Sequence, residues 1–262
     1  AISGIILPML PHKNLLPDVN LTPYSIWLAT VVVSGISYLS YLLKRYVFHE
    51  SGTLVSGIIG GLYSSTATIS VLARKSRKAS EQEATDYVAA MLLAISMMFL
   101  RFMILILIFS REIFLSIYPY LLTMAVVAAI VAWFIHSRQK RSNDQPVEAE
   151  EDDSSNPLEF KVALIFAVLF VIFTFLTHYT LVYAGTGGLN LLSFVSGFSD
   201  ITPFILNLLQ NTGSVAALII TACSMQAIIS NIMVNMFYAL FFAGKGSKLR
   251  PWILGGFGVV IA

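Results

Sequence analysis

Residues 87–109 read YVAAMLLAISMMFLRFMILILIF, and Arg101 is the only charged side chain among them. A helix needs about 20 apolar residues to cross the hydrocarbon core of a bilayer. In lipid every backbone polar group must be satisfied without water, and a helix does this within one segment. The stretch therefore predicts a membrane-spanning helix.

The composition of the whole chain supports this prediction. The 262 residues are 57% hydrophobic and 11% charged, with a net charge of +2 and a mean hydropathy of +0.80. A soluble domain carries about a quarter charged residues, and long unbroken apolar runs exclude a transmembrane barrel, whose strands alternate. We expect an all-α polytopic membrane protein in contact with the lipid bilayer.

Seven apolar blocks follow one another along the chain, and an eighth begins at Trp252. Blocks 1 to 7 are residues 24–43, 52–72, 87–109, 113–135, 162–183, 189–209 and 215–242. Both ends of the chain look like parts of further spans, so we expect a fragment of a longer protein. Residues 137–158 are polar and charged, which is typical of a linker. They separate a first membrane repeat, 1–136, from a second, 159–262, that stops before its last span is complete.

Comparison of the chain with itself predicts two internal repeats of about four blocks each. A shift of 136 residues places Ser64 on Asp200, and a shift of 130 places Arg101 on Asn231. The identities under the first shift are Gly52 with Gly188, Gly61 with Gly197, Thr66 with Thr202, Ile69 with Ile205, and Leu72 with Leu208. The alignment also pairs the blocks in chain order.

Blocks 2 and 6 differ from the others because glycines at their centres precede a run of hydroxyl side chains. Small residues can simply allow helices to pack closely. Alternatively, each block is a broken or re-entrant helix beside a polar cavity, as in transporters with internal repeats. If both blocks return to the side they came from, 13 of the 16 Lys and Arg lie on one side and only Lys13 and Arg111 on the other, with Arg101 inside. This asymmetry favours the re-entrant arrangement and makes the repeats inverted.

Two charged side chains lie well inside apolar blocks. A charge at the centre of a spanning helix costs about 2.5–3.5 kcal/mol on insertion scales. Arg101 should therefore face the protein interior, and Asp200 is its best candidate partner. The pair is either a structural ion pair or part of a site for a substrate or coupling ion.

Hydroxyl and amide side chains complete the candidate substrate or ion site. The predicted site residues are Ser64, Ser65, Thr66, Thr68, Asp200, Thr202, Arg101 and Asn231. Oxygen ligands with one carboxylate suit hard cations or protons, while exposed amides of a broken helix suit anions; the identity of any metal stays open. No catalytic motif is present, so we expect no enzyme, no cofactor and no nucleic-acid partner. Cys223, the only cysteine, is expected to be a small buried apolar residue.

The segments ILPMLP, GIIGGLYSSTATISVLAR and SGFSDITPFILNL together resemble a bacterial membrane domain of unknown function that usually follows an MgtC/SapB-type domain. That family typically carries Asp-x-Asp-Ala in the second glycine segment. Asp200 matches the first aspartate, whereas Thr202 and Pro203 replace the second aspartate and the alanine. Ser230-Asn231 matches a late Ser-Asn pair, but Asn235 stands where a lysine is usual.

The resemblance implies a multi-pass protein of the bacterial inner (cytoplasmic) membrane, with a fused or associated MgtC-like domain. The paired Gly-rich, hydroxyl-bearing blocks predict a secondary transporter or permease for a polar solute or a small ion, and the resemblance implies a divalent cation such as magnesium as one candidate. The alternative is a non-transporting regulatory or interaction module that acts with the MgtC-like domain. A homo-oligomer is compatible with both.

Overall fold

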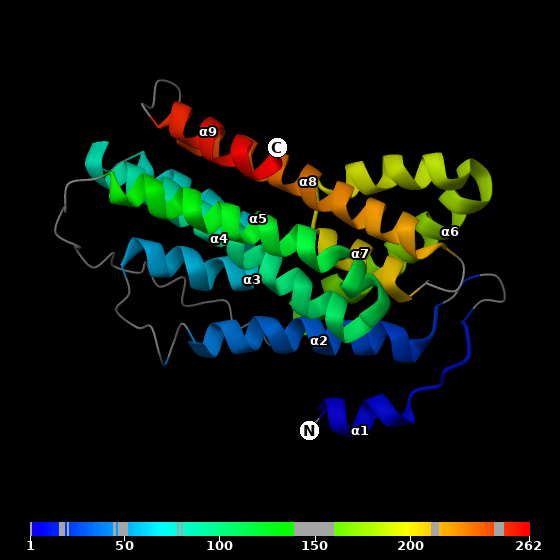
Figure 1. Ribbon diagram of the computed structural model, residues 1–262. Coiled ribbons are helices and arrows are strands. Elements are labelled where there is room, and N and C mark those ends of the chain that lie inside the picture. The colour runs from blue at the N-terminus through cyan, green and yellow to red at the C-terminus, as the bar shows by residue number, and fades with distance from the viewer. Residues whose placement is uncertain are drawn as a thin grey trace. The chain divides into compact units, whose positions relative to one another are not determined.

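The computed structural model shows a protein built from helices (Figure 1). The residues it describes are 2–15, 19, 21–43, 46, 52–77, 79, 81–138, 160–210, 215–243 and 249–262. Across these residues the chain forms nine helices and no β-strand, which confirms the predicted fold class. In chain order they are α1 (Ile2–Met9), α2 (Pro23–Leu42), α3 (Thr53–Ser76), α4 (Glu81–Phe109), α5 (Arg111–Ser137), α6 (Phe160–Ser196), α7 (Ile201–Gln210), α8 (Ala217–Phe242) and α9 (Arg250–Ile261).

Six of the described helices are long and apolar enough to cross a membrane. These are α2, α3, α4, α5, α6 and α8, while α7 and α9 are shorter apolar helices. The chain is therefore a multi-pass membrane protein, as the sequence predicted.

Local polar residues mark the starts of α2 and α5. Ahead of α2, the Ser25 amide donates to Thr22 Oγ1 at 3.0 Å, and the Thr22 amide donates to Ser25 Oγ at 3.1 Å. This reciprocal pair resembles a capping box, and Pro23 occupies a first helical position where no amide is needed. Between α4 and α5, Ser110 Oγ accepts a hydrogen bond from the Ile113 amide at 3.4 Å. The sequence therefore specifies these helix starts locally.

The chain divides into two compact units, each built from segments that are distant in the sequence. The first unit contains Ala1–Tyr38, Ile104–Ile117 and Ser155–Asn231, and the second contains the remaining three segments, Leu39–Met103, Tyr118–Ser154 and Ile232–Ala262. The predicted linker lies almost entirely outside the described residues. The division into repeats on either side of it stays a prediction.

In the second unit, α4 supplies much of the core. Its side chains from Val88 to Leu92 are fully buried. Ser96 Oγ donates to the Ala125 carbonyl of α5 at 2.9 Å, so a hydrogen bond joins these two helices in addition to apolar packing. Interhelical bonds of this kind are common in membrane bundles.

In the first unit, α7 is buried along almost its whole length against α6. The rings of Phe173 and Phe204 lie 5.6 Å apart. Next to them, Asn207 Nδ2 donates to Thr174 Oγ1 at 2.6 Å. The short helix α7 is thus held by one aromatic pair and one polar bond.

Helix α6 consists of two helical stretches that meet at Gly185, where φ is 60° and ψ is −151°. This backbone conformation is essentially restricted to glycine. The kink lies between Tyr183 and Leu189, where the sequence separates blocks 5 and 6. The chain is interrupted a second time within block 6, so that the first part of this block belongs to α6 and its second part forms α7.

Candidate functional site

Helix α3 is broken near its centre, in block 2. Ser64 has φ −157° and ψ 103°, an extended conformation inside an otherwise helical segment. Residues eight apart in a straight helix lie about 12 Å apart along the axis, yet a Cβ added to Gly60 would collide with the side chain of Thr68. The two halves of α3 therefore meet at a sharp bend, which we call the first break.

Side chains satisfy the backbone groups that the first break releases. Ser64 Oγ accepts a hydrogen bond from the Ala67 amide at 3.4 Å, so Ser64 begins the second half-helix. The last carbonyls of a helix lack partners within it, and the Tyr63 carbonyl accepts a hydrogen bond from Arg101 Nη1 of α4 at 2.8 Å. The half-buried arginine thus reaches a backbone oxygen at the end of the first half-helix.

Glycines allow the first half of α3 to lie directly against α4. A Cβ on Gly57 would overlap the Ala90 carbonyl, and a Cβ on Gly61 would overlap the Ala94 carbonyl. Close approach of backbones through small residues is typical of packed membrane helices. Close packing through small residues and a break in the helix therefore both occur in block 2, at different residues, while a polar cavity beside the break stays a prediction.

The second break, residues 197–200, separates α6 from α7 in block 6. Asp200 Oδ1 accepts a hydrogen bond from the Thr202 amide at 2.9 Å, so its carboxylate caps α7. A carboxylate at a helix N-terminus also interacts favourably with the helix dipole. The aspartate that the sequence selected as an ion-site residue thus has a local structural partner.

Helix α8 supplies a side-chain donor to the second break. Asn231 Nδ2 donates to the Gly197 carbonyl at 3.1 Å, and the neighbouring Ser230 Oγ donates to the Phe194 carbonyl at 2.7 Å. A Cβ on Gly197 would lie 2.8 Å from the Asn231 backbone nitrogen and closer still to Ser230. The absence of a side chain at position 197 is what allows α8 to approach this closely.

The predicted site residues fall into two groups, one at each break. Ser64, Ser65, Thr66, Thr68 and Arg101 belong to the first break, and Asp200, Thr202 and Asn231 to the second. Ser65, Thr202 and Asn231 are buried and Asp200 is exposed, while the other four are half-buried. Arg101 and Asp200 lie in different units. Their direct ion pair and a single cavity lined by both breaks stay predictions.

The chemistry at the two breaks is that of hydroxyls, amides, one guanidinium and one carboxylate. Among the described residues, no three His, Cys, Asp or Glu side chains come together in a way that would hold a metal ion. An ion bound at the first break would therefore rely on hydroxyl and backbone oxygens, and one bound at the second break could also use Asp200.

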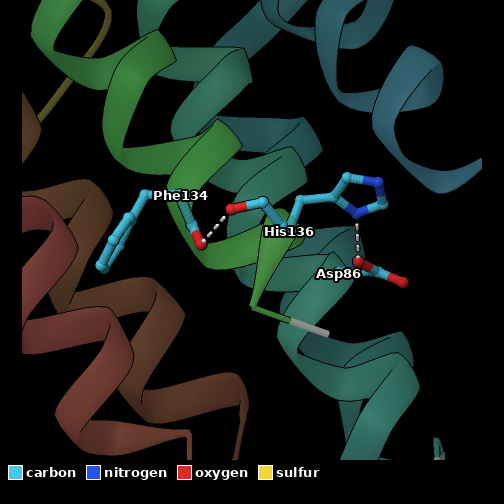
Figure 2. Close-up of polar contacts among 4 residues, drawn as sticks. Asp86, Phe134 and His136 are labelled. Atoms are coloured by element: carbon cyan, nitrogen blue, oxygen red, sulfur yellow. Dashed lines mark hydrogen bonds and ion pairs between the residues drawn. The ribbon is translucent and has the colours of Figure 1, made fainter. Parts of the chain in front are cut away.

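Sequence reasoning missed several polar contacts. His136 Nδ1 of α5 lies 2.8 Å from Asp86 Oδ1 of α4, and Figure 2 shows the two side chains reaching each other across the helices. The Thr174–Asn207 bond was also missed. Asp86 and His136 are polar residues near the ends of adjacent blocks, which is the only signal the sequence offers for their pairing.

Comparison with known proteins gives one family and one relative. The model of a domain of unknown function, DUF4010, matches residues 31–243, which include both breaks. An uncharacterized protein of Aquifex aeolicus (strain VF5) is 26% identical over 205 residues, covering 77% of this chain and 87% of the relative. No solved structure matches the chain.

Proposed function

The chain belongs to the DUF4010 family, and we propose that it is a membrane transporter or permease for a small ion or polar solute, in which each helix break supplies polar groups that contact the substrate. This proposal develops the expectation drawn from glycine and hydroxyl placement in blocks 2 and 6. The MgtC-like partner suggested by the resemblance is not needed for it.

The observation that supports the proposal is that two apolar segments are each interrupted midway by residues with polar side chains. The interruptions are at Ser64 and at residues 197–200. Irregular backbone at membrane depth is tolerated only where protein or a water-filled cavity surrounds it. Secondary transporters use such discontinuous helices to present backbone groups and half-helix ends to a substrate.

The side chains at the breaks limit the class of substrate. They are mainly hydroxyls, such as Ser65 and Thr202, with the carboxylate of Asp200. Oxygen ligands of this kind suit hard cations or protons, and no large apolar ligand is indicated. We propose a small hydrophilic substrate that is coordinated largely by oxygen.

The test is a flux screen in proteoliposomes across monovalent cations, divalent cations and protons. We expect flux of at least one of these with the native chain and at least a tenfold loss with Asp200→Ala. Asp200→Asn separates the two roles of the carboxylate, because asparagine can still cap α7. It should keep the melting temperature but lose flux. Glu112→Gln, at an exposed carboxylate in the first turn of α5, is the matched control.

A non-transporting regulatory module is the competing function. The hydrogen bond from the Thr202 amide to Asp200 favours a regulatory module, because this bond gives the carboxylate a purely structural role. If both Asp200 variants keep the flux of the native chain, Asp200 takes no part in transport. A native chain that carries no ion or solute in the screen would favour the regulatory module.

A further inference from the structure

We propose that Arg101 and Asn231 are corresponding positioning residues, each of which fixes one helix break by donating to the carbonyl that ends the preceding half-helix. We call these contacts the two clamps. Their role in transport rests on the proposed function, whereas their role in holding the breaks is independent of it. This assignment differs from that of a substrate or ion ligand, which the sequence analysis considered for both residues.

The first clamp lies within the second unit. Arg101 Nη1 is 2.8 Å from the Tyr63 carbonyl oxygen, one residue before the extended Ser64. In a continuous α-helix this carbonyl would accept the Ala67 amide, but that amide bonds to Ser64 Oγ at 3.4 Å. A charged donor forms a stronger hydrogen bond than a neutral one. The guanidinium therefore replaces a backbone bond that the break removes.

The second clamp lies within the first unit. Asn231 Nδ2 is 3.1 Å from the Gly197 carbonyl oxygen, directly after the last residue of α6, and the side chain of Asn231 is buried. The missing side chain of Gly197 allows this approach. On the other side of the break, Asp200 accepts the Thr202 amide. Each break thus has a side-chain donor at its first end and a side-chain acceptor at its second.

The order of these parts along the chain is the same at both breaks. Asn231 follows Arg101 by 130 residues, Gly197 follows Tyr63 by 134, and Asp200 follows Ser64 by 136. In each case the donor comes from the next long helix after the break, α4 or α8. At both breaks an accepting carbonyl comes first, a capping side chain second and a side-chain donor third. Two unrelated helix kinks have no reason to show the same order, so the agreement supports a common origin of the two halves.

The experiment measures the breaks directly with pairs of spin labels in a Cys223→Ala background. Cysteines at Thr53 and Arg77 report the angle of the first break, and cysteines at Thr186 and Ala216 flank the second. Arg101→Met should broaden the first distance distribution and leave the second unchanged. Asn231→Leu should do the reverse. Arg101→Lys keeps a long cationic donor and should restore the native distribution.

Matched control variants remove hydrogen bonds that buried serine hydroxyls donate elsewhere in the same units. Ser96→Ala in α4 deletes the bond to the Ala125 carbonyl of α5, and Ser193→Ala deletes the bond to the Leu189 carbonyl within α6. Neither bond touches a break, so both variants should keep narrow distributions. If Arg101→Met and Asn231→Leu also keep them, the clamps are overturned. If Arg101→Met does not fold, Arg101→Gln, which lacks the reach and the charge, takes its place.

Flux gives the second readout. A positioning residue should affect Vmax, with a loss of about tenfold or more in Arg101→Met and recovery in Arg101→Lys, while KM stays within about twofold. A rise in KM with unchanged label distances would instead make Arg101 a substrate ligand and overturn its assignment as a clamp. A native chain without flux would reject the proposed function, and the distance measurements would still decide on the clamps.

Discussion

Asp86 and His136 illustrate how a single polar contact joins two membrane helices. Their side chains lie near the first turns of α4 and the last turn of α5, with exposed fractions of 20% and 44%. Water can therefore reach both groups and screens their attraction. Exposed ion pairs contribute about 0.2–1 kcal/mol in double-mutant cycles, so this contact fixes the alignment of two helix ends more than it stabilises the fold.

A double-mutant cycle tests this interpretation. Asp86→Ala, His136→Ala and the double variant should give a coupling free energy below about 1 kcal/mol, because the pair is partly hydrated. The measurement is reversible unfolding in mixed detergent micelles at low and high salt, and high salt should reduce the coupling further. A coupling above about 2 kcal/mol, or one that is insensitive to salt, would place the pair in a dry environment and contradict the expectation.

At the scale of helices, the sequence predicted the two breaks because glycine and hydroxyl residues weaken helices where they occur. It did not predict the hydrogen bond from Arg101 to a backbone oxygen. The pairing of Arg101 with Asp200 stays a prediction, and the contact described for Arg101 is with the Tyr63 carbonyl. A backbone oxygen becomes available only once the helix is broken, and no residue type in the sequence identifies it. In α6, two helical stretches join at Gly185, within the interval that separates blocks 5 and 6.

Substitutions at neighbouring glycines test the turn within α6. Gly185 has φ 60° and ψ −151°, which an L side chain adopts at a cost of about 1–3 kcal/mol. Gly185→Ala should therefore lower the melting temperature in detergent. Gly187 is helical with open space around it; Gly187→Ala should stabilise the protein by about 0.5–1 kcal/mol, since glycine is a poor helix former. Equal changes in melting temperature for the two variants would show that an alanine at position 185 is not strained.

At the scale of the whole molecule, α3 either crosses the bilayer or returns to the side from which it enters. Its halves contain about 11 and 12 residues, which span about 16 Å and 18 Å, and half of a bilayer core measures about 15 Å. Each half can thus reach the midplane. The bend that brings Gly60 to Thr68 fits a segment that enters and leaves on one side better than a straight crossing. Composition predicts a membrane protein. Whether the loops before and after α3 face the same side depends on this bend, and composition does not determine the bend.

Labelling of single cysteines with an impermeant thiol reagent in intact cells tests the sidedness. In a Cys223→Ala background, cysteines at Tyr46, Ala79 and Ser137 should react only after the membrane is permeabilised, whereas a cysteine at Glu112 should react in intact cells. The reason is the excess of Lys and Arg in the first three regions, which the positive-inside rule places in the cytoplasm. Because α3 is the helix that the structure describes between Tyr46 and Ala79, labelling of these two positions from opposite sides would show that α3 crosses fully. The two halves of the chain would then be parallel repeats, and the charge asymmetry that favours inverted repeats would be lost.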